Sequence, residues 1–199
     1  KVTIIGGGVV GTNAAKMAVG LGAQVTILDV STARLEYLDD IFQGRCQTLY
    51  SNAKNIEESV IGSDLVVGGV LITGQKAPTL VSKDMISQMT KGSVVVDVAV
   101  DQGGCIETCR PTSHTEPTYE IDGVIHYCVP NMPGVVPRTS TYALTNVTLK
   151  YASMIAAMGV EDAVAKNKAL MKGLNVYNGY VCYEPVARDL NMEYRPYKI

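Results

Sequence analysis

The sequence carries almost no net charge, because 17 lysine and arginine residues offset 19 aspartate and glutamate residues and leave a formal charge of −2. A balance this even gives no field that would draw the protein to nucleic acid or to an anionic membrane surface. The sequence lacks any apolar run near the roughly 20 residues that a bilayer-spanning helix needs. It also opens without the basic segment and cleavage signal of a secretory peptide. We therefore expect a cytoplasmic protein with no nucleic-acid or membrane partner.

Cysteine and histidine are scarce and irregularly spaced, which argues against a disulfide framework and a metal site. Five cysteines is an odd number, and their spacing fits free thiols in a reducing compartment. Cys105, Cys109 and His114 follow a spacing that matches no usual zinc pattern, so we expect no metal. His114 lies in a polar loop and His126 in an expected strand. Neither histidine lies in a motif that would indicate a role as a general acid or base.

The first 29 residues are the most informative segment of the chain. Residues 1–5 form a short β-branched run, and the next six residues, GGGVVG, have the form G-x-G-x-x-G. Apolar residues then recur at helical spacing, and a second apolar strand ends at Asp29. This strand–turn–helix–strand–acid order is the context that a dinucleotide-binding fingerprint requires. The alternative is an ordinary strand–turn–helix unit with flexible glycines.

Each residue of this fingerprint has a physical role. Gly6 allows a tight turn, Gly8 lets a pyrophosphate approach the backbone, and Gly11 lets the helix lie close to the strand. The helix N-terminus offers free N–H groups and a positive dipole to the pyrophosphate. Asp29 can accept hydrogen bonds from the adenosine ribose and would repel a 2′-phosphate, which favours NAD over NADP. Arg34 could receive such a phosphate, but Asp29 lies at the strand end where the ribose must lie.

Apolar strands alternate with helical stretches through most of the chain. The expected helices cover residues 31–41, 56–61 and 82–89, and the expected strands cover 47–50, 65–72, 93–100 and 124–128. Continuous apolar strands separated by helices indicate an α/β fold, here a Rossmann-type doubly wound parallel sheet. Ligands bind such sheets at the carboxyl ends of the strands, near the switch in strand order. The segments predicted at that edge are 6–11, Asp29, 70–71, 98–101 and 130–132.

From about residue 139 the pattern becomes helical. Residues 139–141 (TST) can cap a long helix that ends at Gly159, and further helix follows to about Gly173. The tail from Tyr177 is rich in tyrosine, and we expect it to have no sheet partner within the chain. We read this helical extension and tail as packing on a region that precedes the chain.

These patterns divide the chain into two parts. Residues 1–138 form the expected dinucleotide-binding domain. Residues 139–199 form a connecting helix and C-terminal segment that would pack on an N-terminal substrate domain. The chain begins at Lys1, already inside the expected first strand and without an initiator methionine, so we expect it to be a fragment.

Two further motifs follow the fifth and sixth expected strands. The sequence DVAVDQGG, from Asp97 to Gly104, places acids and a flexible Gly-Gly at the ligand edge. An aspartate at a strand end is often only a loop cap, so this motif is weak by itself. Residues 131–141, NMPGVVPRTST, contain prolines that stiffen a loop near the expected cofactor.

Taken together, these motifs resemble the NAD-binding and C-terminal part of the alanine dehydrogenase and transhydrogenase α-subunit family. The segments that carry the resemblance are GGGVVGTNAAKMA, VTILDV, YSNA, VLITGQKAP, VDVAVDQGGC, RPTSH and YCVPNMPGVVPRTSTYALTN, which span essentially the whole chain. The resemblance implies oxidative deamination of L-alanine to pyruvate and ammonia, with reversible hydride transfer to NAD. It also implies a homo-oligomer, since the family forms hexamers.

Matched residue by residue, the resemblance implies a cofactor site. The glycine-rich turn would face the pyrophosphate, the end of the second strand the adenosine ribose, and Ser51 the adenine. Residues after the fourth, fifth and sixth strands would line the cleft and surround the nicotinamide and its ribose. The implied cofactor-binding residues are Gly6, Gly8, Val9, Val10, Gly11, Asp29, Val30, Arg34, Ser51, Val70, Leu71, Leu80, Val98, Asp101, Asn131 and Met132.

Only part of the family's chemistry has a counterpart in this sequence. Asp101 resembles the family's catalytic aspartate. The family's substrate-binding arginine and lysine and its catalytic histidine belong to the N-terminal region and match nothing here. We therefore expect the 199-residue chain alone to be inactive.

Two other functions remain open beside alanine dehydrogenase. The chain could be the NAD(H)-binding subunit of a proton-translocating transhydrogenase, which binds no amino acid and has a membrane-protein partner. It could also be a non-catalytic NAD-binding module, which would stay inert even when joined to a complete N-terminal region.

Overall fold

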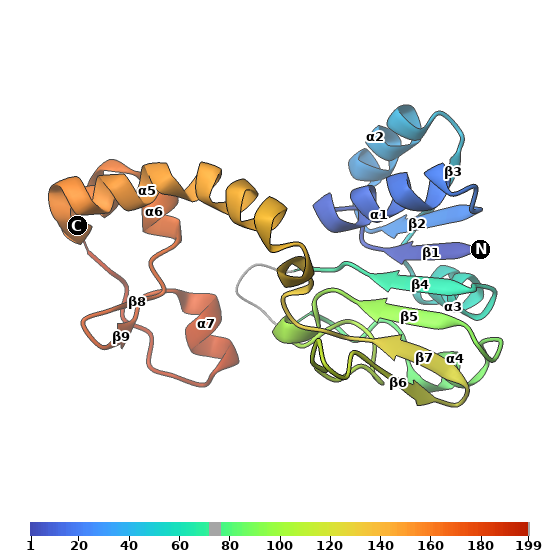
Figure 1. Cartoon of the computed structure of the whole chain (residues 1–199). Coiled ribbons are helices and arrows are strands. Elements are labelled where there is room, and N and C mark those ends of the chain that lie inside the picture. The colour runs from blue at the N-terminus through green and yellow to red at the C-terminus, as the bar shows by residue number, and fades with distance from the viewer. Residues whose placement is uncertain (72–76, 199) are drawn as a thin grey trace. The chain divides into compact units, whose positions relative to one another are not determined.

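The computed structural model of the chain describes residues 1–71 and 77–198. These residues divide into two compact units, one formed by residues 1–71 and 77–132 and the other by residues 133–198. All the predicted cofactor-binding residues lie in the first unit. Figure 1 shows that unit as one sheet with helices packed against it.

The first unit is built on a sheet of seven strands, among the residues that the structure describes, in the order β3-β2-β1-β4-β5-β7-β6. Six strands run parallel and β6 runs antiparallel to β7. The strands are β1 (Val2–Ile5), β2 (Val25–Asp29), β3 (Cys46–Tyr50), β4 (Leu65–Gly68), β5 (Val94–Asp97), β6 (Thr118–Ile121) and β7 (Val124–Tyr127). The strand order switches between β1 and β4, as in a doubly wound sheet, so the predicted fold class is confirmed.

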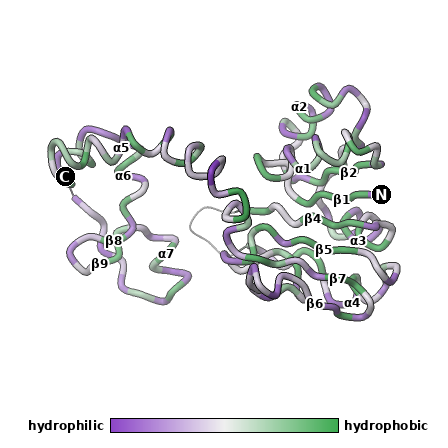
Figure 2. Tube along the Cα trace, viewed as in Figure 1, coloured by the Kyte–Doolittle hydropathy of each residue, from purple (hydrophilic) through white to green (hydrophobic). Residues whose placement is uncertain are grey.

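Helices cover both faces of this sheet. The helices are α1 (Val9–Gly20), α2 (Thr32–Phe42), α3 (Ala53–Ile61) and α4 (Lys83–Ser87). Neighbouring residues of β1, Ile4 and Ile5, are both fully buried but belong to opposite clusters, because successive side chains of a strand point to opposite faces. Ile4 packs in the cluster that α1 and α2 share, and Ile5 in the cluster of α3 and α4. Figure 2 shows the central strands as largely hydrophobic.

Side-chain caps begin three of these helices. Ser31 accepts the N–H of Arg34 at the start of α2, and Asn52 accepts the N–H of Asn55 at the start of α3. The hydroxyl of Ser82 accepts a backbone N–H at the start of α4 in the same way. Each cap satisfies an N–H group that has no partner within the first turn of its helix.

The structure corrects three expectations about the strands: two strands end earlier than expected, and one strand was not expected. The strand expected over 65–72 stops at Gly68, and its expected end at Ile72 lies outside the described residues. The strand expected over 93–100 ends at Asp97, where the chain turns into the short 3-10 helix η1 (Val100–Gln102). Strand β6 was not expected, although Asp122 and Gly123 form a turn with positive φ between β6 and β7. An Asp-Gly pair between two apolar runs is a hairpin signal that the sequence reasoning missed.

The second unit contains the long helix α5 (Pro137–Lys166), the predicted C-terminal helix. Gly159 interrupts α5 with φ 80° and ψ 169°, at the position where the sequence predicted its end. The short 3-10 helix η2 (Met132–Val135) begins at the last residue of the first unit. The rest of the second unit comprises α6 (Lys168–Lys172), β8 (Val176–Tyr177), β9 (Tyr180–Val181) and α7 (Glu184–Asp189). Strands β8 and β9 form a small antiparallel sheet, so the expectation of a tail without a sheet partner was wrong.

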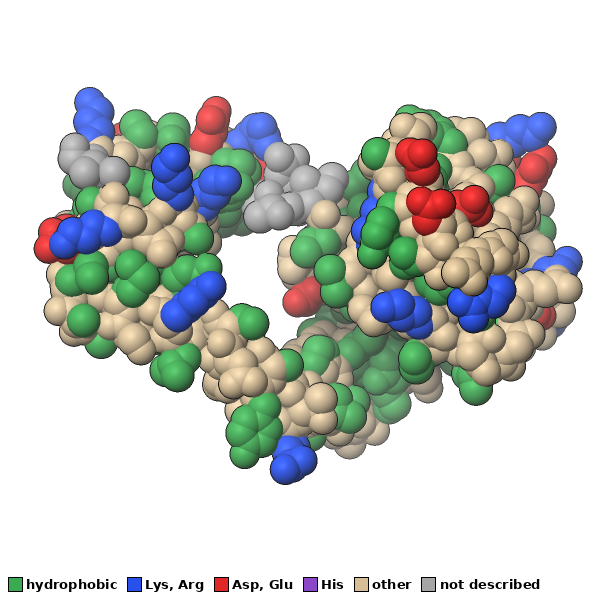
Figure 3. All heavy atoms as spheres, turned by 90° about the horizontal axis from the view of Figure 1, so that it is seen from above, with side chains coloured by type: hydrophobic (Ala, Val, Ile, Leu, Met, Phe, Trp, Pro, Cys, Tyr) green, Lys and Arg blue, Asp and Glu red, His purple; other side chains and the backbone are tan. Residues whose placement is uncertain are grey.

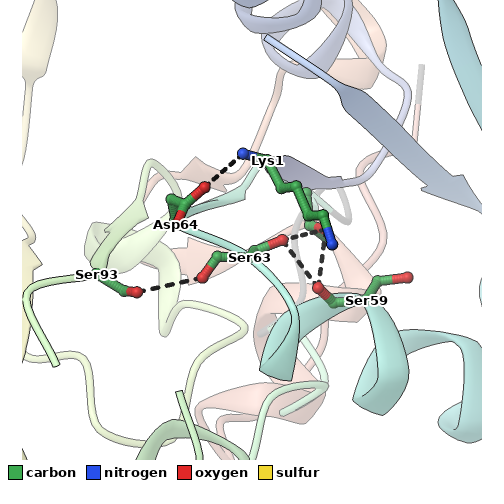
Figure 4. Close-up of polar contacts among 6 residues, drawn as sticks. Lys1, Ser59, Ser63, Asp64 and Ser93 are labelled. Carbon is green, nitrogen blue, oxygen red and sulfur yellow. Dashed lines mark hydrogen bonds and ion pairs between the residues drawn. The ribbon is translucent and has the colours of Figure 1, made fainter. Parts of the chain in front are cut away.

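At the amino edge of the first unit's sheet, hydrogen bonds of serine and threonine side chains connect neighbouring elements (Figure 4). The buried hydroxyl of Ser63 lies 2.7 Å from Oγ1 of Thr3 and 2.8 Å from the carbonyl oxygen of Ser59. The hydroxyl of Ser93 donates to the carbonyl of Ser63 at 3.2 Å. These bonds hold β1, α3 and the residues before β4 and β5 together. They all lie at the amino edge, so none of them occupies the carboxyl edge of the sheet.

On the face shown in Figure 3, each unit mixes charged side chains of both signs with apolar ones. Among the described residues, no helix is both long enough and apolar enough to cross a membrane.

Candidate functional site

The parallel register brings the predicted site segments to one edge of the sheet. Ile5 pairs with Leu28 on one side and with Gly68 on the other, and Gly68 pairs with Asp97. Hydrogen bonds continue this register past the strand ends, since the N–H of Gly6 donates to Leu28 and that of Val98 donates to Gly68. The carboxyl ends of β1, β2, β4 and β5 therefore lie side by side, where ligands bind in open α/β sheets (Figure 1).

The glycine-rich turn has the geometry that a dinucleotide needs. Gly6 has φ +99°, and a Cβ there would lie 2.8 Å from the carbonyl oxygen of Gly69. A Cβ on Gly11 would lie 1.9 Å from the carbonyl oxygen of Gly6, so only glycine allows α1 to approach β1 this closely. A Cβ on Gly8 would meet no atom within 4 Å, which leaves the backbone open at the N-terminus of α1. This open cradle fits a pyrophosphate.

Asp29 lies at the end of β2 and accepts two backbone hydrogen bonds. The N–H of Gly7 donates to Oδ2 at 2.7 Å, and the N–H of Ser31 donates to Oδ1 at 2.8 Å. Each carboxylate oxygen keeps a further lone pair, so the group can still accept ribose hydroxyls. Ser51, predicted near the adenine, donates its backbone N–H to the carbonyl of Asp29 and so lies beside it.

Arg34 lies against the glycine-rich turn, a contact that the sequence did not reveal. Its Nε donates to the carbonyl of Gly7 at 2.6 Å, and its guanidinium also donates to Oγ1 of Thr12 at 2.8 Å. The hydroxyl of Thr12 lies 2.7 Å from the carbonyl of Gly8. The ring of Tyr37 lies 4.8 Å from the guanidinium carbon. Thr12 directly follows the last glycine of the fingerprint, and this position was the only signal for its role.

The other predicted cleft residues follow β4 and precede α4. Val70 is half-buried beside Gly6, and Leu71 is exposed. Leu80 is half-buried, and its N–H donates to the carbonyl of Cys105 at 2.8 Å. This bond connects the segment before α4 to the loop that follows β5.

The loop after β5 contains both a buried and an exposed aspartate. Asp101 is exposed in η1, where its carboxylate is available to a ligand. Asp97 is fully buried and accepts the N–H groups of Ala99, Cys105 and Ile106. Burial raises the pKa of the Asp97 carboxyl above its ordinary value, and the three N–H bonds oppose that rise. The loop-capping role considered for aspartates in this motif therefore belongs to Asp97.

The last predicted contacts follow β7. Asn131 is exposed with φ +52°, and Met132 is half-buried. Asparagine adopts this left-handed conformation more readily than most residues, because its side chain can bond locally to the backbone. The structure thus places Asn131 and Met132 just beyond the end of β7. Val98 is half-buried next to Asp97. Val9 and Val10, at the start of α1, and Val30, just after β2, are exposed.

His126 is a structural residue of β7. Nδ1 lies 2.9 Å from the carbonyl oxygen of Val124, which can only accept, so Nδ1 carries the proton. Nε2 then accepts the hydroxyl of Thr108 at 2.7 Å. Burial lowers the pKa of the His126 imidazole, and the Val124 bond opposes this. His114 is exposed, and the described residues contain no cluster of three or more side chains that could hold a metal ion.

The cysteines are free thiols, all five of them. A hydrogen bond from the Cys109 thiol lowers the pKa of the Cys128 thiol, against the effect of burial. The hydroxyl of Tyr119 lies 3.8 Å from the same sulfur. Cys128 is fully buried just before the turn that contains Asn131.

A cleft of about 520 Å³ lies at the opposite, amino edge of the sheet. Residues before and within β1, β2 and β3 line it, together with Glu58 and Ser59 from α3. None of the predicted cofactor-binding residues is among them. The cleft is therefore separate from the candidate site.

Comparisons with known proteins agree with this geometry. A family model described as "Alanine dehydrogenase/PNT, C-terminal domain" matches residues 1–184. The alanine dehydrogenase of Bacillus subtilis is 62% identical over 197 residues, which cover 98% of this chain and 52% of that protein. That of Methanococcus maripaludis is 61% identical over 98% of this chain and 53% of its own length.

Solved structures give the same result. An L-alanine dehydrogenase matches with a TM-score of 0.85 and 54% identity over 96% of this chain and 52% of that one. A transhydrogenase from Sinorhizobium meliloti matches less well, with a TM-score of 0.57 and 33% identity over 64% of this chain and 36% of that one. The chain thus spans about half the length of the alanine dehydrogenases that it matches here.

Proposed function

The chain belongs to the alanine dehydrogenase/PNT C-terminal domain family, and from this premise we propose that it is the NAD-binding half of an alanine dehydrogenase. The reaction would be the reversible oxidative deamination of L-alanine to pyruvate and ammonia. The observation that carries the proposal is the open cradle at Gly8, with Asp29 beside it, in a chain that is 62% identical to an alanine dehydrogenase.

The residues present fit NAD. The open backbone at Gly8 and the first turn of α1 would hold the pyrophosphate, and Asp29 would accept the adenosine ribose hydroxyls. Arg34 would hold the turn in shape through its bonds to Gly7 and Thr12. NAD supplies the acceptor for the hydride, while the protein supplies orientation and placed charge.

The nicotinamide end would lie over the residues that follow β4, β5 and β7. The proposed contacts there are Val70, Leu71, Leu80, Val98, Asp101, Asn131 and Met132. Asp101 would bind the nicotinamide ribose and stabilise the positive charge that develops at the substrate carbon–nitrogen bond as hydride leaves. Its exposure in η1 supports this role, because a group that touches a ligand must be open to it.

The remaining parts of the proposal concern the complete protein. The cations that bind the substrate carboxylate and the general acid–base would come from an N-terminal substrate domain, on which residues 139–199 would pack. The dinucleotide-binding domain would comprise residues 1–138. We further propose a cytoplasmic homo-oligomer, and the exposed apolar side chains of α5 support such an assembly. These exposed residues are Tyr142, Leu144, Val147 and Leu149.

The test uses the full-length protein that contains this chain. We expect L-alanine to drive NAD reduction, followed at 340 nm, and pyruvate with ammonia to drive NADH oxidation. A panel of other L-amino acids serves as the control for specificity. Binding of NADH without turnover of any amino acid would contradict the proposal and favour a non-catalytic module. Hydride exchange between NADH and an NADP analogue would favour a transhydrogenase subunit.

A further inference from the structure

Asp97 accepts three backbone hydrogen bonds near the proposed site, yet it is fully buried and cannot itself touch a ligand. Oδ1 accepts the N–H of Ala99 at 3.1 Å. Oδ2 accepts the N–H of Cys105 at 2.8 Å and that of Ile106 at 3.1 Å. One carboxylate therefore binds the backbone at both ends of the loop whose exposed tip contains Asp101.

Two of the residues bound by Asp97 also accept backbone hydrogen bonds that shape this loop. The carbonyl of Ala99 accepts the N–H groups of Gln102 and Gly104, which close the turn around Asp101. The carbonyl of Cys105 accepts the N–H of Leu80, a second residue of the proposed nicotinamide end. A change at Asp97 would therefore reach two parts of the proposed site through the backbone.

The space around the carboxylate is closely fitted. A Cβ on Gly104 would lie 2.5 Å from Oδ2 of Asp97, and Gly104 has φ +63°. A Cβ on Gly68 would lie 2.7 Å from the sulfur of Cys105. The loop can take this path only because glycines lie at both positions.

The chemistry of the contact requires a carboxylate. Three N–H donors point at one side chain, and a carboxylate offers only acceptors. An asparagine of the same size would turn one acceptor into an NH₂ donor, so at least one backbone N–H would face another donor. A buried N–H group without a partner is costly, and the loop would move to satisfy it.

We propose that Asp97 is a positioning residue for the reaction: it sets the place of Asp101 by binding Ala99, Cys105 and Ile106. This inference rests on the proposed function, because it takes Asp101 as the residue that acts on the substrate. A purely stabilising Asp97 would lower the melting temperature and leave kcat of the folded enzyme unchanged. A positioning Asp97 lowers kcat well below the melting temperature, because a misplacement of about 1 Å can cost about 100-fold in rate.

The experiment is a double-mutant cycle in the full-length protein, with the variants Asp97→Asn, Asp101→Asn and both together. We expect Asp97→Asn to lower kcat by about tenfold or more, with KM for NAD within about threefold of wild type, because the glycine-rich turn and Asp29 are untouched. If Asp97 acts through Asp101, adding Asp97→Asn to Asp101→Asn lowers kcat no further. Independent effects would multiply instead and would overturn the inference.

A second pair of variants covers the case in which Asp97→Asn does not fold. Gly104→Ala pushes on Oδ2 from the loop side and is expected to lower kcat in the same way. Gly92→Ala is the matched control, because Gly92 also has a positive φ, +88°, but a Cβ there meets nothing within 4 Å. If Gly104→Ala keeps the kcat of Gly92→Ala, the inference is wrong.

The outcomes separate this inference from the proposed function. If Asp101→Asn loses activity while Asp97→Asn and Gly104→Ala keep it, the proposed role of Asp101 stands and the role of Asp97 fails. If Asp101→Asn keeps its activity, the role of Asp101 fails and the inference fails with it. Hydrogen exchange gives the structural readout: the amides of Cys105 and Ile106 should exchange about tenfold faster or more in Asp97→Asn, but not in Asp101→Asn.

Discussion

Individual side chains at the carboxyl edge combine structural and binding roles, and Asp29 is the clearest case. It accepts the N–H groups of Gly7 and Ser31 and so shapes the turn that it would share with the cofactor. Its charge would also repel an adenosine 2′-phosphate. Loss of this carboxylate should therefore affect cofactor choice as well as affinity.

We expect the protein to bind NADH more tightly than NADPH. Asp29→Ala should weaken NADH binding and reduce the difference between the two affinities. Fluorescence titration with both nucleotides measures the two dissociation constants. Asp64→Ala is the matched control, because Asp64 is exposed at the amino edge of the sheet. Equal or tighter binding of NADPH by the wild type would show that Arg34 and not Asp29 decides the choice.

Asp101→Asn in the full-length protein tests the proposed role of that carboxylate directly. Asparagine keeps the size of the side chain but loses its charge, so we expect kcat to fall by about 100-fold or more with NADH affinity nearly intact. Asp122→Asn, in the exposed turn between β6 and β7, is the control, since asparagine suits its positive φ. Steady-state kinetics that stay within a few-fold of wild type would make Asp101 a structural residue.

At the scale of elements, two glycines where β1 meets α1 have different roles, one in the stability of the fold and the other in cofactor binding. Gly11→Ala would place a Cβ 1.9 Å from the carbonyl of Gly6, so we expect the free energy of unfolding to fall by about 3 kcal/mol or more. Gly8→Ala meets no atom within 4 Å and should keep its stability while NADH binding weakens by about tenfold or more. Urea unfolding and NADH titration measure the two effects. A Gly8→Ala variant with unchanged affinity would mean that the pyrophosphate lies elsewhere.

The hairpin of β6 and β7 should make stability depend on pH. Burial lowers the pKa of His126, so the unfolded chain, with a histidine pKa of about 6.5, binds a proton that the folded protein resists. The contribution of neutral His126 to the free energy of unfolding is therefore fully present above about pH 6.5, and it is lost as the pH falls towards the lower pKa of the folded protein. We expect the loss between pH 7.5 and 5.5, measured by urea unfolding, to shrink in His126→Gln. The exposed His114→Gln is the control, and it should behave like wild type.

Which elements could be predicted depended on whether their signals were local. The β1–α1–β2 unit was predicted because the periodicity, three glycines and a terminal acid occur within 29 residues. Strand β7 was predicted, but its partner β6 was missed although the Asp122-Gly123 turn joins them. Strands β8 and β9 were missed because each has only two residues, although the Asn178-Gly179 turn joins them. The contacts of Arg34 with Thr12 and of Asp97 with Cys105 and Ile106 could not be predicted, because no local pattern records which distant backbone groups meet.

At the scale of the whole molecule, the chain should bind cofactor without catalysing the reaction. Every residue proposed for NAD lies within the first unit, which has its own hydrophobic clusters. The substrate-binding cations and the general acid–base are proposed to lie outside these 199 residues. We expect the purified chain to bind NADH, seen as a change in its fluorescence, with no alanine-dependent reduction of NAD. Turnover by this chain alone would mean that the whole catalytic site lies within it.

The central place of β1 in the sheet affects how the protein is made on the ribosome. Its first neighbour, β2, follows at once, but its second neighbour, β4, pairs Gly68 with Ile5. About 60 residues separate these partners, so at translation rates of about 5–20 residues per second the backbone edge of β1 that faces β4 stays unpaired for about 3–12 seconds. The unpaired N–H and C=O groups of such an edge invite pairing with other chains. Nascent chains that stall before β4 should therefore depend most on chaperones.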